Sequence, residues 1–284
     1  MLTAILDGDI FAYEMASGAE EATNWGNGLW TLHAYEKPAI AKMVGRINEI
    51  VDKLKADEIV VALTDDVNWR KEVLPTYKGN RKDVRRPMIL EVLKQYLRDN
   101  YKTYSRPTLE ADDVCGILAT SNKIIKGDKI VVTKDKDFKT FPAKIYFMHD
   151  AESGVIEVSP EEADKWHLMQ TLAGDVTDGY AGCPSVGMET ARKIVENPYG
   201  YVQYEHTFKS GPRKGLTEKR WKKVEMDNVW DAIVSHFEKA GLSEEEALVQ
   251  ARVARICRAS DYDFKNKKVI LWTPSELTKG NNND

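Results

Sequence analysis

Cysteine, histidine and long apolar runs are all scarce in this sequence of 284 residues. Three scattered cysteines support neither a disulfide framework nor a zinc cluster, which fits a reducing compartment: Cys115, Cys183 and Cys257. The five histidines lack metal-ligand spacing, which argues against a histidine-based zinc site. No apolar run approaches the length of a membrane span, and the run from Leu2 to Leu6 ends at Asp7, so it is not a signal peptide. We therefore expect no membrane partner.

Basic residues are slightly outnumbered by acidic ones, and they are strongly segregated along the chain. The chain carries a net charge of −4. The stretch 70–106 nevertheless holds eleven Lys and Arg against four Asp and Glu, and the stretch 205–223 holds seven against two. A protein that needs both phosphate contacts and an acidic metal site would have this distribution. Two solvated basic loops would produce it as well, and charge alone does not choose between the two interpretations.

Short apolar runs alternate with amphipathic stretches in the first half of the chain. Buried strands are expected at 2–6, 59–63, 129–133 and 144–148. Helices are expected at 39–54, 88–97 and from 110 to 122. Strands that alternate with helices imply right-handed crossovers. The sequence therefore predicts an α/β fold, with a mostly parallel central sheet flanked by helices.

The second half of the chain is predominantly helical. Helices are expected at 160–172, 189–196, 228–240 and 243–259, the last beginning with a capping box of Ser243 and Glu246. The polar, basic stretch between 196 and 228 lacks periodicity and is expected to be a long loop or extended insertion. We therefore divide the chain into a core at 1–158, a helical subdomain at 159–277 and a disordered tail at 278–284.

Acidic residues recur where ligands gather in parallel sheets. Asp7, Asp65 and Asp135 each follow a predicted strand closely, which places three carboxylates at one edge of the sheet. Further acids accompany them: Glu110, Asp112, Asp113, Asp137, Asp175 and Asp178. Each cluster alone could be a turn former, a first-turn helix acid or a cap. Together, converging carboxylates repel unless cations neutralise them, and a carboxylate-only set suits Mg²⁺ or Mn²⁺.

Five motifs occur in an order and spacing that resemble a known family. They are Leu6-Asp-Gly-Asp9, the block from Asp65 to Arg81, Leu109-Glu-Ala-Asp-Asp113, Thr133-Lys-Asp-Lys-Asp-Phe138 and Gly174-Asp-Val-Thr-Asp-Gly-Tyr180. The chain resembles the 5′→3′ exonucleases of short-tailed lytic bacteriophages, relatives of flap endonucleases and of the 5′-nuclease domain of bacterial DNA polymerase I. The resemblance extends from Leu6 to about Trp272. It implies the PIN-like 5′-nuclease fold with a helical arch.

The resemblance implies a two-metal site for Mg²⁺, with Mn²⁺ as a substitute. The residues of the first metal would be Asp7, Asp65, Glu110 and Asp112. The second metal would be supported by Asp113, Asp137, Asp175 and Asp178, with Asp135 between the two ions. Two ions in such a site would orient water and stabilise the transition state of phosphodiester hydrolysis. Asp7 and Asp65 therefore count as catalytic residues too.

The basic stretch at about 70–100 would form the helical arch. By the same resemblance Lys78 would place its positive charge against the scissile phosphate. Arg81, three residues later, would share its helical face and contact a phosphate, and Tyr77 would stack on a terminal base. Glycine and few apolar residues predict an arch that is loosely ordered without DNA.

A second nucleic-acid contact is implied at about 174–197, which resembles a helix–hairpin–helix that grips duplex DNA. Gly182 and Gly187 would let the backbone approach a phosphate, and the following helix would point its N-terminus at the anion. Lys193 would contact another phosphate. Family members often bind K⁺ here, but Ser185 replaces a commoner glycine, so the K⁺ site is less secure than the DNA contact.

The resemblance thus implies an exonuclease that releases nucleotides from 5′ ends of duplex DNA, with activity on flaps and on RNA paired to DNA. It also implies a phage-encoded monomer in the cytoplasm of a bacterial host. The first alternative is a strict structure-specific flap endonuclease, which would use the same site. A non-catalytic DNA-binding protein would predict gaps in the acidic set, and none is missing. A single-strand-specific RNase would not need the helix–hairpin–helix.

Overall fold

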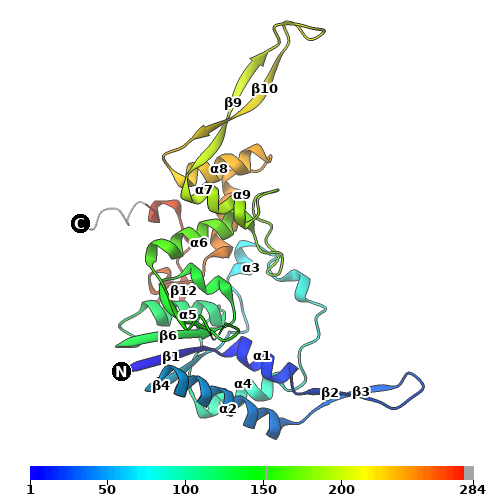
Figure 1. Cartoon of the computed structure of the whole chain (residues 1–284), viewed down its shortest axis with the longest axis vertical. Coiled ribbons are helices and arrows are strands. Elements are labelled where there is room, and N and C mark those ends of the chain that lie inside the picture. Colours follow the sequence, from blue (N-terminus) through cyan, green and yellow to red (C-terminus); the bar gives the residue numbers. More distant parts are fainter. Residues whose placement is uncertain (151, 278–284) are drawn as a thin grey trace. The chain divides into compact units, whose positions relative to one another are not determined.

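The computed structural model describes residues 1–150 and 152–277, so the predicted disordered tail lies outside the described residues. The chain divides into two compact units, whose elements are labelled in Figure 1. The first unit comprises 1–72, 81–163 and 256–271, and the second comprises 73–80, 164–255 and the chain from 272 onward. The expected boundary at 158/159 lies close to the observed change at 163/164. The segment 73–80, expected in the core, belongs to the second unit, and the segment 256–271, expected in the helical subdomain, belongs to the first.

The first unit is built on a six-stranded sheet with the order β5-β4-β1-β6-β7-β8. Its strands are β1 (Leu2–Asp7), β4 (Glu58–Ala62), β5 (Lys102–Tyr104), β6 (Asp128–Thr133), β7 (Ala143–Phe147) and β8 (Val155–Val158). All neighbouring pairs are parallel except β7 and β8. The predicted mostly parallel α/β sheet is confirmed, and the antiparallel edge strand β8 is an addition.

Helices cover both faces of this sheet, as the near-continuous apolar strands require. The helices α1 (Gly8–Ser17), α2 (Glu36–Leu54) and α4 (Leu90–Asn100) share one core with alternate strand residues such as Leu6, Val61 and Val132. The residues between these, such as Ile5 and Val131, are equally buried, and helix α5 (Ala111–Thr120) contacts β1, β4 and β6. This two-sided packing fixes the strand ends that carry the site.

The segment 256–271 packs against α5 of the first unit. It holds a short η3 helix (Ala259–Asp261) and the paired strands β11 (Tyr262–Asp263) and β12 (Lys268–Val269). A Cβ on Gly116 of α5 would lie 2.4 Å from the carbonyl oxygen of Cys257, so only glycine permits this approach. The helix predicted at 243–259 is therefore shorter than expected. Helix α9 ends at Ala254, and the chain from 256 to 271 belongs to the first unit.

The second unit is mainly helical, as predicted. Its helices are α6 (Pro160–Ala173), α7 (Met188–Glu196), α8 (Val229–Lys239) and α9 (Glu244–Ala254), followed by a short η4 helix (Pro274–Glu276). The capping box of Ser243 and Glu246 is present at the start of α9. Leu172, Ile194 and Phe237 are fully buried in the shared core of these helices. Within the described residues, no helix is long and apolar enough to cross a membrane.

Several antiparallel strand pairs were not predicted, among them the short pair of β11 and β12. The stretch expected to be a long loop forms β9 (Tyr199–Thr207) and β10 (Thr217–Glu225), paired antiparallel along their full length. Both faces of this hairpin are largely polar, so the alternation that signals a half-buried strand is missing. The hairpin of β2 (Glu20–Asn24) and β3 (Trp30–Ala34) was missed altogether, although the Gly-Asn-Gly turn at 26–28 was a usable signal.

Candidate active site

The three strand-end aspartates, Asp7, Asp65 and Asp135, follow neighbouring strands of the sheet. Strand β1 lies between β4 and β6, and all three run parallel. The register pairs Asp7 with Ala62 and Leu6 with Val132, so the three strands end at nearly the same level. The predicted placement of these carboxylates along one sheet edge is therefore confirmed. This edge is where parallel sheets bind ligands.

Asp7 is the most deeply placed of these acids, with only 2% of its surface exposed. It caps α1 by accepting the Ile10 N–H at 3.3 Å, and it accepts the Thr133 hydroxyl at 3.0 Å. Burial, together with the nearby charges of Asp9 and Asp135, raises the pKa of Asp7 to about 7. A carboxylate that is hard to ionise alone is one that a bound cation would stabilise.

Asp65 and the start of α5 are joined by hydrogen bonds. The Asp65 carboxylate accepts the backbone N–H of Thr108 at 2.8 Å, and the Thr64 hydroxyl accepts the N–H of Ala111 at 2.9 Å. Glu110 occupies the N-cap of α5, and Asp112 lies in its first turn. The end of β4 is thus fixed to the helix that carries the next two predicted ligands.

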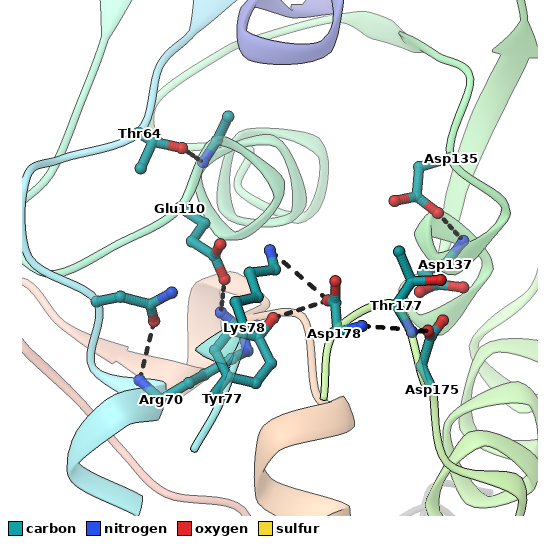
Figure 2. Close-up of polar contacts among 12 residues, drawn as sticks. Thr64, Arg70, Tyr77, Lys78, Glu110, Asp135, Asp137, Asp175, Thr177 and Asp178 are labelled. Carbon is teal, nitrogen blue, oxygen red and sulfur yellow. Dashed lines mark hydrogen bonds and ion pairs between the residues drawn. The ribbon is translucent and has the colours of Figure 1, made fainter. Parts of the chain in front are cut away.

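Asp113 has a different role from the predicted one. It is fully buried, and Arg70 binds both of its oxygens at 2.8 Å (Figure 2 shows Arg70 beside Glu110). The Trp69 indole N–H and the Cys257 backbone N–H each donate to it at 3.0 Å. These donors saturate both oxygens, so Asp113 is not available as a metal ligand, and that assignment is wrong.

The pKa of Asp113 follows from these contacts. Burial on its own raises the pKa, but the charge and hydrogen bonds of Arg70 outweigh it and hold the pKa below its ordinary value. Arg70, in the short helix α3 (Arg70–Val73), is itself only 2% exposed and also binds Glu110 at 3.0 Å. Arg70 lies within the motif from Asp65 to Arg81, but the sequence pattern did not predict its role.

Asp135 and Asp137 lie at the start of a short helix after β6. Asp135 is the N-cap of η2 (Lys136–Thr140) and accepts the Asp137 N–H at 2.8 Å, as Figure 2 shows. Both side chains are half-buried. An aspartate that caps a helix through one oxygen retains capacity on the other.

Asp175 and Asp178 belong to the second unit. Asp175 orders its own loop by accepting the N–H groups of Thr177 and Asp178, at 2.6 and 3.3 Å. The Asp178 carboxylate accepts the Tyr77 hydroxyl at 2.9 Å and lies 3.6 Å from the Lys78 ammonium (Figure 2). The Lys78 N–H also donates to the Asp178 carbonyl at 2.7 Å.

The predicted helical arch differs from the chain as folded. Helix α3 ends at Val73, Lys78 has a left-handed backbone with φ of 52°, and only a 3₁₀ turn, η1 (Gly79–Arg81), follows. Lys78 and Arg81 therefore do not share a helical face, and that argument was wrong. Helix α4 is part of the first unit's core. The Lys78 N–H donates to the Asp178 carbonyl, a contact between residues far apart in the sequence that local pattern does not reveal.

Tyr77 is also placed differently from the prediction. Its ring is 3% exposed and packs in a small cluster with Tyr180, Val253 and Ala254. A buried ring is not available to stack on a base, so this part of the prediction is wrong. Arg81, in contrast, is exposed. Tyr77 instead positions Asp178 through its hydroxyl.

The glycine-punctuated turn before α7 has two distinct halves. Gly174 and Gly182 both have positive φ, and their backbones lie so close that a Cβ on Gly182 would be 2.3 Å from the Gly174 nitrogen. The Gly182 N–H donates to the Gln250 side chain at 2.8 Å. Gly182 is therefore a packing residue, which contradicts its predicted phosphate contact.

The second half of this turn, from Ser185 to Gly187, is largely exposed to solvent. Ser185 is exposed with φ of 65°, and Gly187 is the exposed N-cap of α7. Lys193, on α7, is exposed and pairs with Glu189 at 3.7 Å. An open turn at a helix N-terminus is compatible with an anion contact.

The acidic residues do not form a closed ligand cage. In the part of the chain that the structure describes, no three Asp, Glu, His or Cys side chains are grouped as metal ligands. The acids instead bind Arg70, Lys78 or backbone N–H groups. Metal binding at these carboxylates stays a prediction, and it requires some of these contacts to rearrange.

Comparisons with known proteins identify the family of this chain. Residues 3–165 match the 5′-3′ exonuclease, N-terminal resolvase-like domain family. The exodeoxyribonuclease of Enterobacteria phage T3 is 36% identical, over 95% of this chain and 92% of the relative. The exonuclease of Escherichia phage T7 is 35% identical, over 95% and 93%. The chain belongs to the 5′-3′ exonuclease family, and it is a nuclease of the hydrolase class.

A solved structure agrees with the fold. A flap endonuclease of bacteriophage T5, solved with DNA and metal ions, superimposes with a TM-score of 0.60 at 14% identity, over 89% of both chains. At that identity the likeness concerns the fold alone. The predicted 5′-nuclease fold and the predicted family are therefore both confirmed.

The distinct roles of Asp113 and its neighbour Asp112 can be separated by mutation. Asp113→Asn removes the charge that pairs with buried Arg70, and breaking such a pair costs about 3–5 kcal/mol. We expect a clearly lower melting temperature. Asp112→Asn, half-buried in the same helical turn, should abolish most nuclease turnover and leave the melting temperature nearly unchanged. Thermal melting by circular dichroism and turnover in Mg²⁺ give the two readouts. Equal melting temperatures would contradict the structural role of Asp113.

Proposed function

We propose that this nuclease hydrolyses phosphodiesters from the 5′ ends of duplex DNA with two divalent cations, preferably Mg²⁺. The observation that carries the proposal is the row of strand-end aspartates on neighbouring parallel strands, in a chain of the 5′-3′ exonuclease family. The phage relatives are an exodeoxyribonuclease and an exonuclease, and the solved bacteriophage T5 enzyme was crystallised with DNA and metal ions.

The donor set of the first unit fits hard divalent cations. Asp7, Asp65, Glu110 and Asp112 would hold one ion, and Asp135 and Asp137 would support the other. The raised pKa of Asp7 supports this assignment, since burial leaves its charge short of compensation. When bound, the ions would activate the attacking water and neutralise the leaving oxygen. By the family resemblance, Asp175 and Asp178 would also be metal ligands.

Arg70 positions the ligands and does not touch the substrate. Its guanidinium holds Glu110 at 3.0 Å and Asp113 at 2.8 Å, which fixes the first turn of α5. Bidentate pairs of this kind restrict the carboxylate geometry. Glu110 and Asp112 are thereby presented from a rigid helix start, as a preorganised site requires.

Lys78 would act at the phosphate that is cleaved. In the structure its ammonium lies beside the Asp178 carboxylate, which balances part of its charge. A cation bound by Asp178 would compete for that carboxylate, and the Lys78 charge would then be free to stabilise a developing negative charge on the phosphate. Arg81, which is exposed, would contact a neighbouring phosphate.

The exposed turn before α7, with Ser185 and Gly187, would grip the duplex. Ser185 and Gly187 would bring backbone N–H groups to a phosphate, and Lys193 would add a charge. By the family resemblance, a K⁺ ion would bind at this turn. These contacts would hold the duplex in register without reading its sequence.

The substrate range would include flaps and RNA paired to DNA, and the enzyme would act as a monomer in the cytoplasm of a bacterial host. Phage relatives support the host context. A strict flap endonuclease is the alternative, and it is favoured by a 26% identical relative over 140 residues, a flap endonuclease of Shewanella oneidensis. Both activities would use the same carboxylates.

An end-labelled digestion distinguishes these activities. Duplex DNA labelled at the 5′ or at the 3′ end is incubated with the protein in Mg²⁺, and a flap substrate is run in parallel. With 5′-labelled duplex, we expect the label to appear at once in short products. With 3′-labelled duplex, we expect the labelled strand to shorten gradually from its 5′ end. Chelator should stop both. Cleavage at flap junctions alone would favour the strict endonuclease, and shortening from the 3′ end would refute the proposed polarity.

Lys78 and Lys193 should affect different steps. Lys78→Ala should lower the single-turnover rate on saturating DNA by one or more orders of magnitude, since its charge matters in the transition state. Lys193→Ala should leave that rate unchanged, weaken binding and reduce the salt slope of binding by about one unit. Single-turnover kinetics and salt-dependent binding measure the two effects. The same pattern for both variants would show that one of the two placements is wrong.

A further inference from the structure

The hairpin of β9 and β10 extends beyond the helices of the second unit. In Figure 1 its outer part projects past α8 and has no other element beside it. Each strand has nine residues, which corresponds to about 30 Å of extended chain. Only the base is anchored, where Tyr201 N–H donates to Ser235 and Tyr199 stacks edge-on with His236. The outer hairpin therefore contributes little to the unit's core.

The hairpin is basic in a chain that is acidic overall. Between Tyr199 and Glu225 there are seven Lys and Arg residues against three Glu, in a chain of net charge −4. The tip from 208 to 216 holds three basic residues and no acid. Lys219 and Trp221 lie on one face of the ribbon, and Lys222 lies on the other, by the alternation of the paired strands.

Some of these charges already have partners within the hairpin. Arg220 and Arg213 pair with Glu218, at 2.6 and 3.4 Å, and both guanidinium groups lie over the ring of Phe208. Lys223 lies 3.4 Å from the ring centre of Tyr199. These contacts stiffen the hairpin, because each arginine or lysine is held over a ring of the same ribbon.

Four lysines of the hairpin are exposed, three of them in its outer half and Lys222 nearer its base. In the described chain, none of the four makes an ion pair, and Lys219 makes none even with Glu205 opposite it in the register. They are Lys209, Lys214, Lys219 and Lys222. Four like charges on a stiff, exposed ribbon repel one another unless a polyanion neutralises them. A duplex supplies such neutralising charge, because each of its strands carries one phosphate per about 3.4 Å.

The hairpin begins where the proposed duplex contact ends. Helix α7, which carries Lys193, stops at Glu196, and β9 begins three residues later at Tyr199. Both belong to the same unit, so a duplex gripped at the start of α7 has the hairpin as an adjoining basic surface.

We propose that the β9–β10 hairpin is a second duplex-binding element, whose four exposed lysines contact the phosphate backbone beyond the grip at α7. The proposal rests on the proposed action on duplex DNA. The ribbon length corresponds to about nine base pairs of backbone, so long duplexes reach it and short ones do not. The hairpin thus adds affinity and keeps the enzyme on long DNA between cleavage events, without entering the chemistry.

The test compares two variants with the same change in net charge. The hairpin variant is Lys209→Gln, Lys214→Gln, Lys219→Gln and Lys222→Gln. The control variant is Lys37→Gln, Lys42→Gln, Lys123→Gln and Lys126→Gln, which changes four exposed lysines of the first unit. Binding to blunt duplexes of about 10 and about 40 base pairs is measured against salt concentration, and thermal melting verifies folding.

We expect the hairpin variant to bind the long duplex at least about tenfold more weakly than wild type, with a salt slope lower by two or more units. It should bind the short duplex like wild type and retain the single-turnover rate on saturating DNA. The control variant should match wild type throughout. Equal binding of the long duplex by both variants would overturn the proposal, as would equal losses on both duplex lengths. If wild type itself failed to digest 5′ ends, the proposed function would fail separately.

Discussion

Mutual repulsion of carboxylates at one sheet edge is the constraint on which this structure depends. Parallel packing of β4, β1 and β6 forces Asp7, Asp65 and Asp135 to the same edge. The first turn of α5 adds Glu110 and Asp112. Part of this negative charge is compensated by the buried guanidinium of Arg70 and by N–H donors at helix starts. The pKa of Asp7 is nevertheless raised. Cations are the remaining compensation, and catalysis is what they would add.

The two positive groups nearest the acids have opposite assignments. Arg70 is buried and saturated by Asp113 and Glu110, so it serves the architecture. Lys78 is only partly buried and pairs with Asp178 at 3.6 Å, a longer contact that a cation can displace. The buried Arg70 pair thus holds the start of α5 in place, whereas the partly buried Lys78 pair belongs to the residues for which we propose a role at the phosphate. The hairpin lysines have a third proposed role, which is to bind the duplex backbone.

The sequence predicted those parts that depend on local pattern. Apolar runs such as 2–6 and 129–133 became central strands, and the aspartates after them reached one edge as expected. It failed where tertiary contacts decide. Nothing local distinguishes Asp112 from Asp113, yet only Asp113 meets Arg70 and the Cys257 N–H, which lies 144 residues away. Lys78 has a left-handed backbone and donates its N–H to the distant Asp178 carbonyl, which local pattern does not predict. The β9–β10 hairpin was not predicted because both of its faces are largely polar.

The claim that these carboxylates assemble around divalent cations is tested most directly by thermal melting. Wild type and the double variant Asp135→Asn, Asp137→Asn are melted in chelator and in excess Mg²⁺. Mg²⁺ that binds only the folded protein should raise the wild-type melting temperature by mass action. The double variant should gain little from Mg²⁺ and should melt above wild type in chelator, because neutral amides relieve the repulsion. A wild type that is indifferent to Mg²⁺, or a variant that gains as much, would contradict the account.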